Sequence, residues 1–379
     1  MKTFHLTLPA LLLVLTACGS TVPVARQEEA KEVNIGYGTA TQETISSAVS
    51  SVPVDTDSVP YADIYEMLQG KASGVVVTGK SVKIRGVNSI YSSTEPLFIV
   101  DGSPMSDISS INPRDVKSID VLKDAASCAI YGSRGANGVI IITTKRGKEG
   151  KVRVDFDASV AVQTYAHKME VLNAKEFGQV MWQGYVNDGL DPNMNGLGYH
   201  YDWSYDNNGV PVLNALSMNK YLDAAGTTPA ADTDWFDLTT RNGLAQQYNV
   251  AISNGSERGM SYLSLGYYNN KGIIEHSDFE RFSARMNADY KLMKIGELNV
   301  VTIGENFTLN RTSEVQAPGG FLENVLQFNP SLPVYTTNGD YAGPVGGYPD
   351  RENPVARLER NADNRYTYWR AFGDVYLNI

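Results

Sequence analysis

Residues 84–147 decide the fold, and they read IRGVNSIYSSTEPLFIVDGSPMSDISSINPRDVKSIDVLKDAASCAIYGSRGANGVIIITTKRG. The stretch predicts short elements separated by turns. Residues 97–100 (LFIV) are an apolar run that ends at Asp101 and Gly102, a dipeptide suited to the positive φ angles of a tight hairpin. The other predicted elements are strands at 118–122 and 139–144 and an Ala-rich, two-turn helix at 124–130 with an acidic start.

Several long sequence motifs in this stretch match a known family. They are IRG at 84–86, PLFIVDG at 96–102, INPRDVKSIDVLKDA at 111–125 and AIYGSRGANGVIIITTKRG at 129–147. Through them the segment closely resembles the plug domain of TonB-dependent outer-membrane transporters of the SusC/RagA group. Three later words resemble the start of that family's barrel: TDWFDL at 233–238, YLSLGYYNNKGII at 262–274 and SDFERFSARMN at 277–287. The resemblance implies a small α+β plug domain at 61–150, followed at 151–379 by antiparallel transmembrane β-barrel strands and outer loops.

The N-terminus predicts an exported protein. Lys2 precedes a mostly apolar run at 4–14 that is too short to span a bilayer, so residues 1–17 are predicted to be a signal peptide. The run leads into LTAC, which resembles the lipobox of bacterial lipoproteins and makes Cys18 a candidate lipid anchor. Ordinary signal-peptidase cleavage is the alternative.

Residues 18–60 are polar and rich in Ser, Thr, Val and Glu, which predicts a mobile leader. One short segment of the leader resembles the box through which this family contacts TonB. An extended segment of this kind is suited to adding a strand to a partner's sheet, and a plain linker is the alternative. The candidate TonB-contacting residues are Glu32, Val33, Asn34, Ile35, Gly36 and Tyr37.

Two amphipathic helices are predicted outside the deciding stretch. Residues 63–69 predict a short one, and residues 75–78 are predicted to begin the plug sheet after it. Residues 174–186 predict a longer helix, because Asn173 can cap it and Glu176 completes a capping box.

From residue 151 onward, apolar and polar side chains alternate, which predicts strands with two different faces. The pattern is clearest at 281–291, where Arg281 and Arg285 lie on the opposite face from Phe282. A soluble sandwich would alternate in the same way, but charges along a whole strand face favour a water-filled lumen, and strands of about ten residues suit an oblique membrane crossing. No apolar run after the signal peptide is long enough for a membrane-spanning helix, so insertion is expected through strands.

The length of this region predicts an incomplete barrel. Residues 151–379 are expected to hold six to eight strands, whereas transporters of this family resemble barrels of about 22 strands. The sequence also ends inside a predicted strand, DVYLNI at 374–379. A fragment or a truncated gene product is therefore the expectation.

Composition excludes several classes of protein. A formal net charge of −10 and 22 Tyr argue against nucleic acid as a partner and suit an outer-membrane protein. The four His are scattered, and neither HExxH nor CxxC spacing occurs, so the protein is not expected to be an enzyme. Cys128 is predicted to be a small buried apolar residue.

A loop after the predicted longer helix has the spacing of a calcium site. Asp191, Asn193, Asn195 and Asp202 offer oxygen atoms at positions 1, 3, 5 and 12, with Gly196 at position 6. Calcium is therefore a possible cofactor. A solvated, Asn/Asp-rich outer loop is the alternative.

Aromatic residues gather in the same loop. Aromatic rings beside carboxamides and carboxylates can hold sugar rings by stacking and hydrogen bonding, although they can equally pack the loop or form the interfacial girdle of a barrel. The candidate ligand-contacting residues are Tyr91, Tyr199, Tyr201, Trp203 and Tyr205.

The resemblance implies a transport function. Members of this family sit in the lipid of the cell outer membrane and import oligosaccharides or peptides that are too large for porins. They work with a SusD-like surface lipoprotein, and the TonB complex displaces the plug. The alternatives are a truncated plug fragment that does not transport and a surface-anchored interaction protein.

Overall fold

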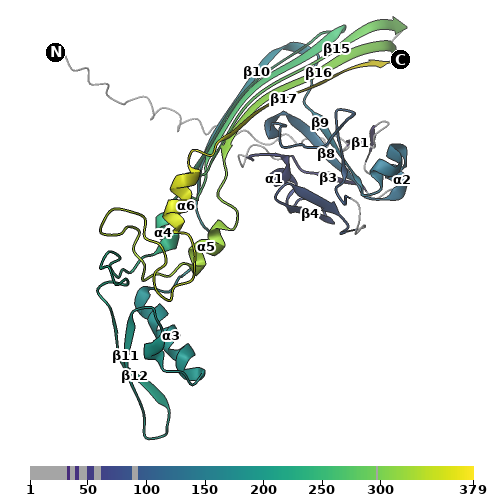
Figure 1. Ribbon diagram of the computed structural model, residues 1–379. Helices are drawn as coiled ribbons and strands as arrows, with labels where there is room; N and C mark the ends of the chain where they lie inside the picture. The colour runs from purple at the N-terminus through teal and green to yellow at the C-terminus, as the bar shows by residue number, and fades with distance from the viewer. Residues whose placement is uncertain (1–31, 35–38, 42–48, 55–60, 88–92, 296–297) are drawn as a thin grey trace, which may run out of the picture.

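The computed structural model describes residues 32–34, 39–41, 49–54, 61–87, 93–295 and 298–379. A small mixed sheet forms the centre of the plug, and a long six-stranded sheet forms a curved wall. Figure 1 shows the plug on the concave side of this wall. The sequence therefore correctly predicts a plug domain followed by antiparallel strands.

The plug sheet has five strands and is mostly antiparallel, and only β6 and β9 run parallel to each other. Its apolar side chains, mainly Val, Ile and Leu, form a buried core with the first helix. The strands, in spatial order, are β3 (Val49–Val52), β8 (Val116–Leu122), β9 (Val139–Thr144), β6 (Leu97–Val100) and β7 (Ser103–Met105). The helical elements are α1 (Ile64–Leu68), α2 (Ala125–Cys128) and the 3₁₀ helices η2 (Pro113–Asp115) and η3 (Ala129–Gly135).

The predicted hairpin is confirmed. Asp101 and Gly102 connect β6 to β7 with φ angles of 49° and 93°, the left-handed conformation that the DG dipeptide tolerates. The predicted strands at 118–122 and 139–144 are present as β8 and β9. The short helix α1 is also present, and the side chain of Asp63 caps it by accepting a hydrogen bond from the Glu66 N–H.

One local prediction is only partly confirmed and another is wrong. Of the α-helix predicted at 124–130, only α2 is α-helical, and the chain continues as the 3₁₀ helix η3, which is kinked at Gly132. The strand at 75–78 is β4 (Val75–Thr78), but it pairs with β5 (Ser81–Ile84) in a separate two-stranded sheet rather than in the plug sheet.

The wall consists of long antiparallel strands, each hydrogen-bonded to the next one along the wall. They contain 13 to 18 residues, so they are longer than the predicted ten. Among the described residues β10 and β17 each pair on one side only, so the wall is open rather than closed. The strands are β10 (Gly150–Gln163), β13 (Gly243–Gly255), β14 (Gly259–Lys271), β15 (Asp278–Ile295), β16 (Leu298–Val315) and β17 (Tyr366–Asn378).

The wall is polar inside and apolar outside. On β15, Arg281 is 1% exposed, and Arg285 is also buried on the face toward the plug. Phe282, on the opposite face, is 46% exposed, and Tyr290 is exposed too. β13 and β16 follow the same rule, because their Asn, Gln and Thr side chains are buried while apolar side chains point outward. A soluble sandwich buries the apolar face of its sheets, so this arrangement is that of an incomplete barrel around a plug.

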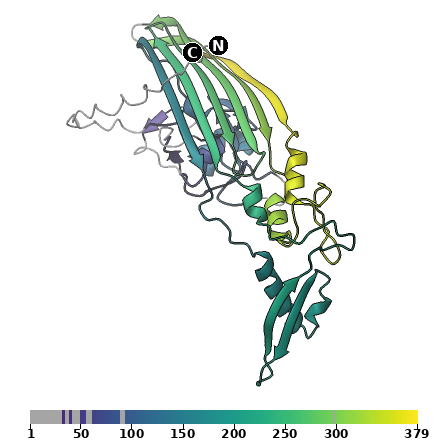
Figure 2. The same cartoon turned by 90° about the vertical axis from the view of Figure 1, so that its left-hand side faces the viewer.

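The connections differ at the two ends of the wall. At one end the strands follow one another closely: β13 ends at Gly255 and β14 begins at Gly259, and β15 ends at Ile295 and β16 begins at Leu298. At the other end, residues 164–242 and 316–365 form a second body, here called the distal body. Figures 1 and 2 show it extending beyond the wall, away from the plug.

The distal body contains a hairpin and several helices around an aromatic core of its own. The helix predicted at 174–186 is present as α3, and its Asn173–Glu176 capping box is formed. The elements are α3 (Ala174–Asn187), η4 (Pro192–Met194), β11 (Tyr199–Tyr205), β12 (Pro211–Met218), α4 (Trp235–Thr239), α5 (Phe321–Gln327) and α6 (Pro354–Asn361). Throughout the described part of the chain, no helix combines the length and the apolar character needed to cross a membrane.

Candidate functional site at the plug–wall interface

A buried ion pair joins the plug to the wall. Asp101, in the turn after β6, pairs with the guanidinium group of Arg285 from β15, and the two side chains are 2% and 3% exposed. The Asp101 carboxylate also accepts hydrogen bonds from the Thr144 N–H at 2.9 Å and hydroxyl at 2.7 Å. Arg285 donates a further bond to the Thr308 hydroxyl at 2.7 Å. Since buried charges are costly unless they are paired and hydrogen-bonded, this network fixes the position of the plug.

Further side chains of β15 bind the backbone of the plug and of the linker that follows it. Arg281 donates hydrogen bonds to the carbonyl oxygens of Ala62, at 2.5 Å, and Ser109, at 3.2 Å. Asn287 donates to the carbonyl oxygen of Lys145 at 2.7 Å. These groups lie on one face of a single strand because alternate residues of a strand point the same way. β15 therefore contacts the plug along much of its length.

Other strands of the wall add three polar contacts. Asn249 of β13 accepts a hydrogen bond from Asn112 of the plug at 3.0 Å. The Tyr262 hydroxyl of β14 donates to the Asp115 carboxylate of the plug at 3.1 Å. Burial raises the pKa of Asp115, and hydrogen bonds from Ser264 and Tyr262 partly offset this cost. The third contact joins Arg370 of β17 to Asp107 of the plug at 2.7 Å.

The linker between plug and wall, residues 145–149, is held at the end of the wall where the strand connections are short. Arg146 donates to Asp289 at 2.9 Å, to Asn306 at 3.0 Å and to the Tyr376 hydroxyl at 2.6 Å, so it contacts three strands. Gly147 lies so close to the wall that a Cβ atom would approach the backbone nitrogen of Ser261 to 2.5 Å. Only glycine fits there.

These contacts make an interface of hydrogen bonds and ion pairs rather than of apolar packing. Water can replace each hydrogen bond when the surfaces separate, so such an interface can be opened without exposing a large apolar surface. Its geometry is specific nonetheless, because a buried charge that loses its partner is strongly disfavoured. The arrangement can therefore hold the plug in one position and still permit its release.

Two of the predicted ligand-contacting residues are packed inside the distal body. Tyr199 and Tyr201 are buried against α3, and their hydroxyl groups donate to the carbonyl oxygens of Ala174 at 2.7 Å and Gly178 at 3.0 Å. Burial raises the pKa of Tyr199 to about 12. Their packing corresponds to the alternative interpretation of the aromatic cluster.

The other two described candidates lie further along the same hairpin. Trp203 and Tyr205 are in ring contact, with centroids 5.4 Å apart, and Tyr205 is 64% exposed. Ligand contact by this pair stays a prediction. Tyr91 lies outside the described residues.

The predicted calcium ligands mostly bind the backbone of their own loop. Asp191 caps η4 by accepting from the Asn193 N–H, and Asn193 in turn accepts from the N–H of Tyr201. Asn195 accepts a hydrogen bond from the Leu197 N–H, and Asp202 is exposed on β11. Within the described residues, no group of three or more His, Cys, Asp or Glu could hold a metal ion. Calcium binding stays a prediction.

The predicted N-terminal sites are only partly described. Residues Glu32–Asn34 form strand β1, which pairs antiparallel with β2 (Thr39–Thr41). Ile35, Gly36 and Tyr37 lie outside the described residues, as does Cys18. TonB contact and lipid anchoring therefore stay predictions.

Sequence reasoning missed the residues that hold the plug. The sequence places Asp101 only in a turn and Arg146 only at the end of the plug. The signal that could have found their partners is the charged strand face at 281–291, because Arg285 on it binds Asp101 and Asp289 on it binds Arg146. A long cation on a face that surrounds a plug needs a partner on that plug.

Comparison with known proteins agrees with this architecture. The family model described as TonB-dependent Receptor Plug Domain matches residues 41–139. TonB-dependent receptor P26 of Formosa agariphila is 32% identical over 355 residues, which cover 88% of this chain and 32% of the relative. TonB-dependent receptor SusC of Bacteroides thetaiotaomicron is 29% identical over 354 residues, covering 88% of this chain and 31% of the relative. The chain thus spans about a third of the length of these relatives.

Solved structures of the RagAB peptide importer share the fold. The "open-open" state aligns with a TM-score of 0.63 at 23% identity and covers 91% of this chain and 40% of that one. The "closed-closed" state aligns with a TM-score of 0.59 at 25% identity, covering 83% and 37%. Together with the plug-domain match and the curated relatives, these similarities identify the chain as plug and barrel strands of a SusC/RagA-type TonB-dependent receptor.

Proposed function

We propose that the chain works in the cell outer membrane as part of a TonB-dependent importer. The observation that carries this proposal is the polarity of the wall, whose buried arginine and amide side chains face the plug while its apolar side chains face outward. Lipid is the environment that suits an apolar outer face of this kind. A plug held by hydrogen bonds that water can replace suits a gate that opens when TonB pulls on it.

The proposed solutes are peptides or oligosaccharides, taken up together with a SusD-like surface lipoprotein. RagAB, whose fold the chain shares, is a peptide importer, which supports peptides as one class. The distal body is the proposed outer end, because membrane barrels have short periplasmic turns and longer outer connections. Its exposed hairpin, with Trp203 and Tyr205, offers a surface for the solute or the lipoprotein. The role requires no bond of the solute to be broken.

The proposed energy supply acts through the leader. TonB would bind residues 32–37 by strand addition. Because the leader leads directly into the plug, a pull on these residues would act on the plug. Residues 1–17 would be removed on export, and Cys18 would carry a lipid. The pairing of β1 with β2 supports an extended conformation at residues 32–34.

Uptake by the source bacterium tests this function. A deletion strain is complemented with the wild-type gene, with a Val33→Pro variant, or with Val24→Pro as a matched control in the leader outside the TonB segment. Proline removes the N–H that strand addition needs, so Val33→Pro should abolish uptake of labelled peptides and oligosaccharides while Val24→Pro retains it. Normal uptake of every tested solute in the deletion strain, or with Val33→Pro, would contradict the proposal.

A further inference from the structure

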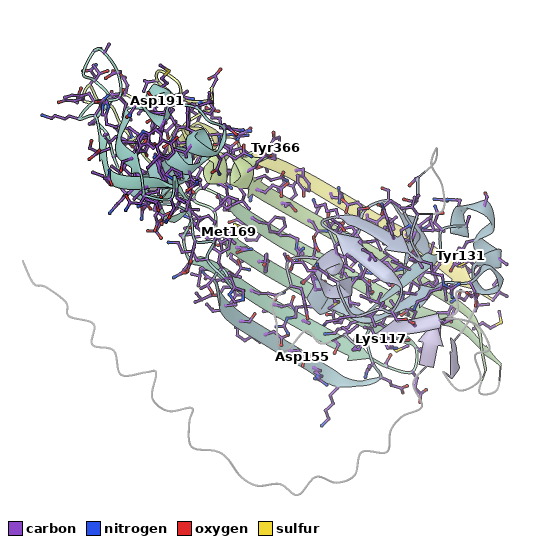
Figure 3. All side chains as sticks on the ribbon, turned by 90° about the horizontal axis from the view of Figure 1, so that it is seen from below. Lys117, Tyr131, Asp155, Met169, Asp191 and Tyr366 are labelled. Atoms are coloured by element: carbon purple, nitrogen blue, oxygen red, sulfur yellow. The ribbon has the colours of Figure 1, made fainter. Side chains whose placement is uncertain are left out.

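A cavity of about 730 Å³ lies between the plug and the wall, at the end with the short strand connections. Plug strands β8 and β9, the linker and wall strands β10, β13 and β14 all contribute to its lining. Figure 3 labels one lining residue from each side, Lys117 of the plug and Asp155 of β10. The plug–wall contacts described above do not fill this space.

The lining of the cavity is strongly basic. It contains two carboxylates, Glu149 and Asp155, in a chain whose formal net charge is −10. Against them stand six cations: Lys117, Lys145, Arg146, Lys148, Lys151 and Arg153. The cavity therefore concentrates positive charge that the chain as a whole lacks.

The two arginines of the lining are paired, whereas its four lysines are not, within the part of the chain that the structure describes. Arg146 is neutralised by Asp289, and Arg153 by Asp155 at 2.8 Å. The ammonium groups of Lys117, Lys145, Lys148 and Lys151 form no ion pair with any residue that the structure describes. A cleft lined by one sign of charge between low-dielectric walls focuses its field and raises the local concentration of counter-ions.

We propose that this cavity binds a multiply charged anion, through the carboxylate or phosphate groups of the imported solute. The assignment rests on the proposed import function, because the cavity lies where a solute passing the plug would leave the wall. Lysine suits such a passing contact, because its flexible, strongly hydrated ammonium group binds anions without the fixed geometry of a bidentate arginine.

The site should also depend on the position of the plug. Lys117 belongs to β8, whereas Lys151 belongs to β10, so displacement of the plug would separate the two groups. An anion held between them would bind the seated plug and leave when the plug moves. Binding and release would then follow the gating cycle.

The test is titration calorimetry on the purified receptor in detergent, with pentaglutamate as the probe and pentaglutamine as its neutral match. Only pentaglutamate should bind, and added salt should weaken its binding. The variant Lys117→Gln/Lys151→Gln should bind it about tenfold more weakly, the loss expected for two solvent-exposed charge contacts. Both side chains are exposed, so the substitutions should leave the fold intact.

The matched control removes two exposed lysines elsewhere, with Lys175→Gln on α3 and Lys271→Gln at the end of β14. It should bind pentaglutamate like the wild type. Equal affinity for both peptides, or equal weakening by the test and control variants, would overturn the inference. Loss of anion binding with intact uptake would refute only this site, whereas absent uptake with intact anion binding would refute only the import function.

Discussion

Asp101 lies in a turn of the plug, yet its carboxylate is bound by Arg285 of the wall, and both side chains are almost fully buried. Asp101→Asn keeps the left-handed backbone, which Asn tolerates, and the bond from the Thr144 N–H, but it removes the charge. Because the buried guanidinium of Arg285 then lacks its charged partner, the free energy that holds the plug in the wall should fall by about 3–5 kcal/mol. Protease cleavage of the plug in increasing urea measures this change.

The control for this substitution is an exposed ion pair in the distal body. Arg360 pairs with Glu352, and both side chains are largely exposed. Arg360→Gln should change stability by no more than about 1 kcal/mol, since solvent screens such pairs. If Asp101→Asn released the plug no more readily than Arg360→Gln, the buried pair would not be what holds it.

The contact between Asp107 and Arg370 predicts a pH dependence. Burial alone would raise the pKa of Asp107, but hydrogen bonds from the Ser109 N–H and hydroxyl and from Arg370 outweigh it and lower the pKa. The stabilisation from a lowered carboxyl pKa is present above the unfolded value, about 3.9, and is lost as the pH falls through the folded value. The protection factor of the Ser109 amide hydrogen, which compares its exchange rate with the intrinsic rate at the same pH, should therefore fall only below about pH 4. In Asp107→Asn this acid-induced step should be missing, and its persistence would assign the effect to another group.

At the scale of elements, the linker depends on its glycine. Gly147→Ala would push the linker away from β13 and β14, because the added Cβ meets the backbone of Asn254 and Ser261. Overpacking of this kind should cost about 1–3 kcal/mol in urea unfolding. Gly184→Ala is the matched control, since that site on α3 is open and helical, and it should stabilise by up to about 1 kcal/mol. If the two variants had the same urea-unfolding midpoint, the linker would not be held against the wall.

Local sequence signals predicted most of the elements. The DG dipeptide specified the β6–β7 hairpin, Asn173 and Glu176 specified the start of α3, and period-two alternation specified the wall. The failures had local physical causes as well. Gly132 interrupts regular helical winding after α2. Strand β4 pairs with β5 in a hairpin and does not join the plug sheet.

The site could not be predicted in the same way, because its contacts join residues far apart in the sequence. Asp101 and Arg285 belong to different domains, and neither has a local pattern that names the other. The aromatic candidates could not be told apart for a different reason: a tyrosine that stacks on a ligand and one that packs under a helix look alike in sequence. Only burial separated Tyr201 from Tyr205.

At the scale of the whole molecule, the reversed polarity of the wall decides between a membrane barrel and a soluble sheet. The two faces alternate residue by residue on β10, where Val154 points outward and Asp155 lines the cavity beside the plug. Each conclusion about gating depends on this assignment, because a plug can be released only from a polar inner face. A direct comparison of the two neighbouring positions therefore tests whether the outer face of the wall meets lipid.

The measurement uses Val154→Cys and Asp155→Cys, each in a chain whose Cys18 and Cys128 are replaced by serine. Each thiol carries a fluorophore, and the receptor is placed in bilayers that contain brominated acyl chains. Bromolipid should quench the label at 154, and aqueous iodide should quench the label at 155. Bromolipid quenching at 155 but not at 154, or iodide quenching of both labels with no effect of bromolipid, would contradict this prediction.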